Sequence, residues 1–313
     1  MTKTTATAKK NSKVSPQQSQ PTAKQPDLKE FLSDDPNFSF TISWQEVAPV
    51  YNQVLRSGAR KIKQPGFRPG KVPPSLAEDL LDEGYLIREV LQKLAPQAYQ
   101  TALKAQTLRP FCEPEIVIKK AVKNQDWQLT AYLPQKPLIK LPDYKKFLQQ
   151  QKKLALEKIA TEKKASKSPE TSTKQAAADQ ALIALLQEIK PKVSLIMVRR
   201  SAQKEWERLQ SELAAHQLTL ATYLQKMNLT TQEMEAQLMW GALQNLQIEF
   251  ILDALLEAEK ITANEAEIKQ KMKKSFKDLN SQQLAAQYEQ EQVRNYFSLL
   301  VQREKLAKWL SDL

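Results

Sequence analysis

The residues with the most distinctive chemistry lie in the nine-residue stretch from Pro65 to Pro73. It contains two of the chain's five glycines, three prolines, Phe67, and the two cations Arg68 and Lys71. An exposed phenylalanine offers apolar area to a partner's pocket, and an arginine presents a rigid fork of donors to a carboxylate or phosphate. These residue types favour a docking contact rather than bond-breaking chemistry.

A second interpretation of the same stretch is a tight turn whose phenylalanine folds back onto its own domain. Glycine and proline punctuate a short connection between two helical patterns. A loop runs over the surface, which favours exposure of Phe67 at its tip. The local residues by themselves leave both interpretations open.

Catalytic and metal-binding chemistry has few candidate residues in this chain. His216 and Cys112 are its only histidine and cysteine. One of each cannot assemble a Cys/His zinc site, and most hydrolytic triads would lack their base. No phosphate-binding glycine loop, dinucleotide fingerprint or nucleophile elbow occurs. We therefore predict a protein that is not an enzyme and that uses no metal or cofactor.

Composition limits the class of protein and its surroundings. The chain has 313 residues and a net charge of +12, which is enough length for two or three domains and favours an anionic partner such as RNA. Mean hydropathy is −0.55, and no apolar run approaches the roughly 20 residues of a membrane helix. The lone cysteine makes a reducing compartment the default, so we expect a cytoplasmic protein.

Hydrophobic periodicity predicts an α+β domain over residues 37–140. Apolar residues alternate at Phe38, Phe40 and Ile42, as in a strand. Helical patterns follow from about Glu46, and residues 115–118 and 127–133 have strand character. Residues 1–36 are rich in Thr, Ser, Gln and Lys, so we expect a disordered basic tail, which we prefer to a transit peptide because arginine is absent.

The second half of the sequence is almost uninterrupted helical pattern. Residues 141–177 are expected to form a helical and flexible linker, and residues 178–313 a helical domain. Capping boxes are predicted at Thr230–Glu233 and Thr262–Glu265, and Ser194 can cap another helix. Five methionines could line an adaptable apolar surface or simply fill cores: Met197, Met227, Met234, Met239 and Met272.

The loop resembles the ribosome-docking signature of the trigger factor family, bacterial chaperones that meet nascent chains at the tunnel exit, in the pattern Gly66-Phe67-Arg68-x-Gly70-Lys71-x-Pro73. Residues 37–42 resemble the first strand of that family's ribosome-binding domain, and residues 293–296 resemble a run near its C-terminus. The resemblance implies that five residues bind the ribosome: Gly66, Phe67, Arg68, Gly70 and Lys71. Pro69 departs from the family, which often has a cation there.

The resemblance also implies the architecture of the whole chain. It would be an α+β protein with a small ribosome-binding domain followed by an extended, mostly helical chaperone domain. Most trigger factors carry a prolyl isomerase domain between these two parts. Residues 141–177 leave too little chain for it, because below about 40 residues a chain seldom folds alone. We infer that the isomerase domain and its catalysis are missing.

The resulting hypothesis is an ATP-independent, non-catalytic chaperone that docks on the large ribosomal subunit and holds nascent or unfolded polypeptides. Its expected partners are a tunnel-exit protein, ribosomal RNA and unfolded chains, with a homodimer as an option and no membrane. The alternative is a basic nucleic-acid-binding protein in which the net charge is the main feature. A ribosome-free holdase of the periplasmic kind is a third, disfavoured hypothesis.

Overall fold

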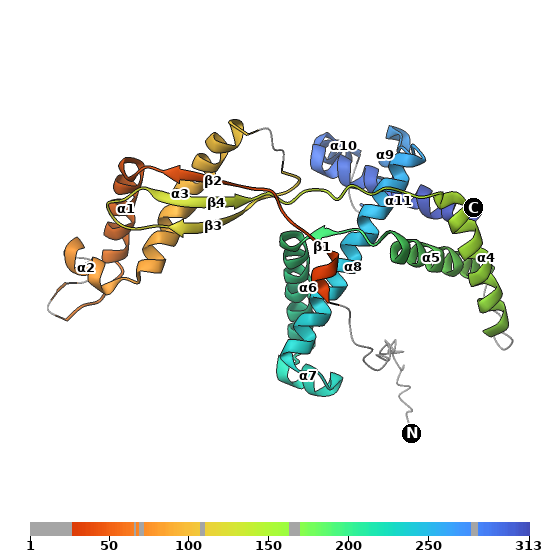
Figure 1. The fold of residues 1–313 in the computed structure, drawn as a ribbon, viewed down its shortest axis with the longest axis horizontal. Coiled ribbons are helices and arrows are strands. Elements are labelled where there is room, and N and C mark those ends of the chain that lie inside the picture. The colour runs from red at the N-terminus through yellow and green to blue at the C-terminus, as the bar shows by residue number, and fades with distance from the viewer. Residues whose placement is uncertain (1–26, 66, 69–71, 107–109, 163–169, 277–280) are drawn as a thin grey trace, which may run out of the picture.

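A computed structural model describes residues 27–65, 67–68, 72–106, 110–162, 170–276 and 281–313. An α+β unit lies at one end of an elongated molecule, and a helical body forms the rest (Figure 1). Helices dominate and the strands are few, which confirms the predicted α+β class. In chain order the first unit contains β2 (Asn37–Ile42), α1 (Trp44–Ala59), α2 (Pro74–Leu80), α3 (Glu83–Lys104), β3 (Glu115–Lys120) and β4 (Trp127–Tyr132).

The sheet of the α+β unit has the antiparallel order β2-β4-β3, with β4 in the centre. Phe38, Phe40 and Ile42 are buried on one face of β2 while the residues between them are exposed, as the alternation predicted. Leu129 of β4 faces Phe40 of β2 on one side and Ile118 of β3 on the other. The predicted strands at both ends of this unit are therefore confirmed.

Helices α1 and α3 cover the sheet and complete its core. Ser43 begins α1 with a capping box, in which the Glu46 carboxylate accepts from the Ser43 backbone N–H at 3.2 Å. Apolar stripes on both helices then face the strands. The buried side chains of this core are Phe38, Phe40, Ile42, Val47, Tyr51, Val54, Leu55, Ala59, Val72, Ala77, Leu86, Val90, Tyr99, Trp127, Leu129, Ala131 and Leu133.

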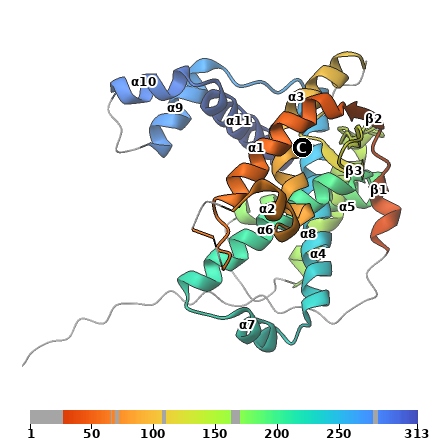
Figure 2. The ribbon, with the colours of Figure 1, turned by 90° about the vertical axis from the view of Figure 1, so that its left-hand side faces the viewer.

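The helical body is built around the 28-residue helix α8 (Thr231–Ala258). The other helices of the body are α4 (Tyr144–Glu162), α5 (Glu170–Ile189), α6 (Leu195–Ala215), α7 (Leu220–Met227), α9 (Glu265–Ser275), α10 (Ser281–Glu289) and α11 (Glu291–Asp312). The N-terminal half of α8 forms a first arm with α6 and α7, in the lower part of Figures 1 and 2. Helices α9 to α11 form a second arm in the upper part of both views.

Residues 27–36 differ from the expectation of a disordered tail. Leu28–Phe31 form a 3-10 helix, and Leu32–Ser33 form strand β1, which pairs in parallel with β5 (Val193–Ser194). Leu28, Phe31 and Leu32 are partly buried against the body core around Val198 and Leu243. These apolar contacts and the pairing of β1 with β5 attach the segment to the body. The expectation for residues 1–26 lies outside the described residues.

Residues 141–177 form part of the body rather than a separate linker. Helices α4 and α5 lie side by side and bury Leu148, Ala178 and Leu185 in one core with Leu255 of α8 and Leu306 of α11. The boundary expected at residue 177 therefore falls inside α5. The part of this stretch that was expected to be flexible is helical from Glu170 onward, where α5 begins.

Two of the helix caps predicted from the sequence are present in the body, and the third lies at a different residue. Thr230 and Glu233 form the predicted capping box at α8, and Ser194 caps α6. The prediction of a box at Thr262–Glu265 is wrong by two residues. Asn264 is the N-cap of α9, and its side chain accepts from the Glu267 N–H at 2.9 Å. Asn and Thr are both favoured N-cap residues, so the spacing in the sequence could not decide between Asn264 and Thr262 as the cap of α9.

Asn264→Ala is expected to lower the free energy of unfolding by about 1 kcal/mol, because it removes the cap acceptor. Thr262→Ala should cost much less, since Thr262 contributes its backbone carbonyl, which accepts from the Lys305 ammonium at 2.9 Å. Urea unfolding of both variants measures the difference. Equal losses would contradict the assignment of Asn264 as the cap.

Candidate functional site

The predicted docking residues lie in the connection between α1 and α2. Of the five, Phe67 and Arg68 are described by the structure, and both side chains are exposed. Gly66, Gly70 and Lys71 lie outside the described residues. Phe67 is 40 % exposed as a residue and belongs to no buried core, so its ring does not fold back into the core of its own domain.

Apolar contacts to the core lie on both sides of the connection. Ile62 packs against the core before the loop, and Val72 is buried in it immediately after. Between them, the Phe67 backbone N–H donates to the Gln64 carbonyl at 3.1 Å and closes a turn. Phe67 and Arg68 lie at the surface, outside this core.

Helix α2 approaches α1 closely at Gly58. A Cβ atom at Gly58 would lie 2.6 Å from Cδ1 of Leu81, the residue that follows α2. The absence of a side chain on Gly58 thus lets the segment after α2 pack directly on α1. This packing sets where the loop between the two helices emerges.

A polar brace joins α2 to the rest of the unit. The Tyr51 hydroxyl on α1 donates to the Glu78 carboxylate on α2 at 3.1 Å, and the Lys123 ammonium donates to the same carboxylate oxygen at 2.5 Å. The hydrogen bond from Lys123 holds the pKa of Glu78 below its ordinary value. Burial, together with the contact to Glu78, raises the pKa of Tyr51 to about 12. Sequence reasoning missed this brace, because its members are far apart in the chain.

An apolar groove of about 430 Å³ lies in the first arm, between α6, α7 and α8. Trp206 and Leu220 line it without belonging to any of the buried cores, and Arg199 and Glu235 are among its polar lining. Met234 and Met239 also line it, although Met234 is itself buried. Met197 and Met272 are core residues and Met227 is exposed, so the methionines divide between the two interpretations.

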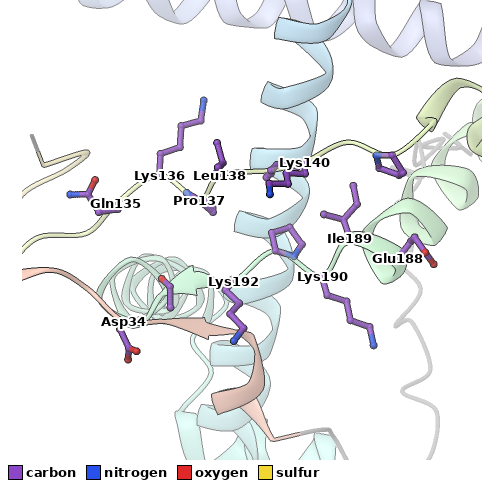
Figure 3. Close-up of a pocket in the computed structure, with 14 residues that line it drawn as sticks. Asp34, Gln135, Lys136, Pro137, Leu138, Lys140, Glu188, Ile189, Lys190 and Lys192 are labelled. Carbon is purple, nitrogen blue, oxygen red and sulfur yellow. The ribbon is translucent and has the colours of Figure 1, made fainter.

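A second hollow, of about 590 Å³, lies where residues 135–142 cross the end of α5 (Figure 3). Lys136, Lys140, Lys190 and Lys192 are among its lining residues. Figure 3 shows Lys136 and Lys190 pointing in opposite directions, so these ammonium groups do not converge on one point. The hollow marks the place where the two parts of the molecule meet.

Over the described ranges, no group of three or more His, Cys, Asp or Glu side chains is placed to hold a metal ion. Within those ranges, no helix is long and apolar enough to cross a bilayer. The arrangement that remains is a surface loop at one end and an apolar groove in the body.

Comparison with known families shows to which family the chain belongs. A family model described as bacterial trigger factor protein (TF) matches residues 29–168, and one described as its C-terminus matches residues 153–312. The second model alone covers about half of the chain. The chain therefore belongs to the trigger factor family, as the loop motif implied.

Individual relatives match over a shorter range. Trigger factor of Streptococcus pneumoniae (strain JJA) is 36 % identical over 107 residues, which is 34 % of this chain and 25 % of that protein. Trigger factor of Nocardioides sp. (strain ATCC BAA-499 / JS614) is 35 % identical over 103 residues, 33 % of this chain and 22 % of that protein. These alignments thus span about a quarter of the curated relatives' length.

A solved chain, from a study of promiscuous substrate recognition by the trigger factor chaperone, aligns over 88 % of this chain and 96 % of that chain. Its TM-score is 0.48 and its sequence identity 10 %, a likeness too distant to establish anything further.

Glu78→Gln is expected to loosen α2 at neutral pH and to have a smaller effect in acid. A carboxylate with a lowered pKa stabilises the fold above its ordinary value of 4.5, and the effect is lost as the pH falls through the lowered value. The melting temperature should therefore fall at pH 7 and should fall progressively less as the pH is lowered, with a cost below about 1 kcal/mol because both partners are partly exposed.

Asp79→Asn is the matched control for this change, since Asp79 is an exposed neighbour on the same helix. It should leave the melting temperature unchanged at pH 7 and in acid. A loss for Glu78→Gln of equal size at pH 7 and in acid would show that the carboxylate charge is not what holds α2.

Proposed function

We propose that this chain is a non-catalytic chaperone that docks on the large ribosomal subunit through the loop between α1 and α2. The observation that carries the proposal is the exposed pair Phe67 and Arg68, in a loop flanked by the partly buried Ile62 and the buried Val72. Phe67 would enter an apolar pocket of a tunnel-exit protein. Arg68, together with Lys71, would contact ribosomal RNA phosphates or acidic side chains.

The helical body would hold nascent or unfolded polypeptides without ATP. The groove in the first arm offers Trp206, Leu220 and Met239 to apolar client segments. Such segments gain free energy when they leave water, and a client would leave the groove once it buries the same segments in its own core. The flexible thioether of Met239 suits clients of varied shape.

The absence of isomerase activity is the second part of the proposal. Two observations support it. The two family matches overlap over residues 153–168 and leave no intervening segment for another domain. Helices α4 and α5 occupy the corresponding stretch and are packed into the core of the body. We further propose residues 37–140 as the docking module and the helices from Tyr144 onward as the client-binding body, acting in the cytoplasm.

Phe67→Ala and Arg68→Ala are each expected to reduce co-sedimentation with ribosomes, and the double change should abolish it, because the anchor residue and its charged neighbour act on the same contact. Leu80→Ala and Arg88→Ala are matched controls. Leu80 is 44 % exposed on α2, and Arg88 is exposed on α3, and neither belongs to the loop.

Ribosome binding that survives the double change would overturn the docking proposal. Strong binding to naked RNA by the double variant, with a steep dependence on salt, would instead support the nucleic-acid-binding alternative. A peptide assay for prolyl isomerisation with the intact chain tests the non-catalytic part, and a rate above the uncatalysed one would contradict it.

Trp206→Gln and Leu220→Gln are expected to weaken the suppression of aggregation of an unfolded client, measured by light scattering. The melting temperature should change little, since neither residue belongs to a buried core. Leu154→Gln is the control, because Leu154 is an exposed leucine on α4 outside the groove. Equal losses for all three variants would show that the groove is not the client site.

A further inference from the structure

The chain passes between the α+β unit and the helical body twice, and both passages are attached to the body. The first passage is residues 33–37 and the second is residues 133–143. The Leu133 backbone N–H donates to the Pro36 carbonyl at 2.8 Å, so the two passages are also bonded to each other. A connection made of two bonded strands resists bending and twisting far more than a single flexible linker would.

The first passage is attached through residues 28–35, called here the strap. Strand β1 of the strap pairs with β5 in the register Leu32 to Val193 and Ser33 to Ser194. The Ser194 hydroxyl donates to the Asp35 carboxylate at 2.7 Å. Phe31 packs edge-on against Trp240 of α8, with ring centroids 5.5 Å apart. The strap therefore joins the body by backbone pairing, a hydrogen bond and apolar contact.

Arg200 of α6 attaches the α+β unit to the body at another point. Its guanidinium donates to the Glu113 carbonyl at 2.6 Å and to the Pro114 carbonyl at 3.1 Å, and it lies 3.7 Å from the sulfur of Cys112. These acceptors belong to the segment just before β3. The planar guanidinium of Arg200 thus donates to two consecutive backbone carbonyls of the α+β unit, a geometry that only arginine provides.

The second passage is attached along α8. Lys136 forms ion pairs with Asp253 at 3.6 Å and Glu257 at 3.2 Å. The Tyr144 hydroxyl donates to Glu259 at 2.6 Å, and Lys145 pairs with the same carboxylate at 2.8 Å. Two carboxylates of α8 therefore bind the second passage, and Glu259, the C-cap residue of α8, binds the start of α4 directly after it.

We propose that the strap, the Arg200 fork and the α8 carboxylates together form a rigid joint that fixes the direction of the docking loop relative to the client groove. Arg200 is its principal positioning residue. The functional part rests on the proposed docking: a chaperone bound by one small loop presents its groove to an emerging chain only if the body cannot swing about that loop. With a rigid joint, a contact made only by the docking loop fixes the orientation of the whole helical body.

Arg200→Met tests the joint by removing the donors while keeping an unbranched apolar stem. Arg208→Met is the matched control on the same helix, because Arg208 pairs with Glu205 and Glu212 of α6 itself. Dyes on non-natural residues at exposed Gln53 in α1 and exposed Gln225 in α7 report the distance between the two parts in single molecules.

Wild type and Arg208→Met should each give one narrow distance distribution. Arg200→Met should give a broad one, with the detached population rising about tenfold or more, since hydrogen bonds to a charged donor are among the strongest that side chains make. Phe31→Ala should broaden the distribution independently, because it acts on the strap. Narrow distributions for both variants would overturn the proposal.

Stalled ribosomes separate this inference from the docking proposal. Arg200→Met should bind them as tightly as wild type but lose cross-links from Trp206 to the nascent chain, whereas holding of free unfolded client should be unchanged. Retained cross-links with a broad distance distribution would refute the orienting role. Loss of ribosome binding by Phe67→Ala is scored separately, so failure of the docking site would be visible as such.

Discussion

The packing of Ile62 and Val72 against the sheet core, on either side of one loop, is the constraint on which the functional interpretation depends. The sheet core accepts these two side chains, and α1 and α2 are drawn together at Gly58. Between them, Phe67 and Arg68 lie at the surface, outside the core. The exposed ring is therefore flanked on both sides by residues that pack against that core.

The two halves of the molecule use different means to present apolar surface. In the α+β unit Phe67 is exposed on the loop between α1 and α2, and one ring suits one specific pocket. In the first arm several side chains line a wide groove between helices, and Trp206 and Leu220 contribute to no core. A wide, open groove discriminates little among apolar segments, as a holder of unfolded chains requires.

Helices α4 and α5 complete the body on the side of α8 and α11. Their apolar faces meet α8 and α11, so Leu148, Leu185 and Leu306 share one core. Lys152 also donates to the carbonyls of Leu310 and Ser311 at the end of α11, at 3.2 and 2.6 Å. The lysine-rich α4 thus contributes to the core of the body together with α5.

The sequence by itself determined the local features: the alternating strand at Phe38, Phe40 and Ile42, the cap at Thr230, and the loop that led to the family. Each depends on residues close together in the chain, where spacing reports geometry directly. Only the tertiary structure decided that residues 27–36 join the body, that Glu78 is braced by Lys123, and that Arg200 grips residues 112–114. These contacts join residues distant in sequence, and their energies depend on surfaces that exist only after the helices and strands have packed.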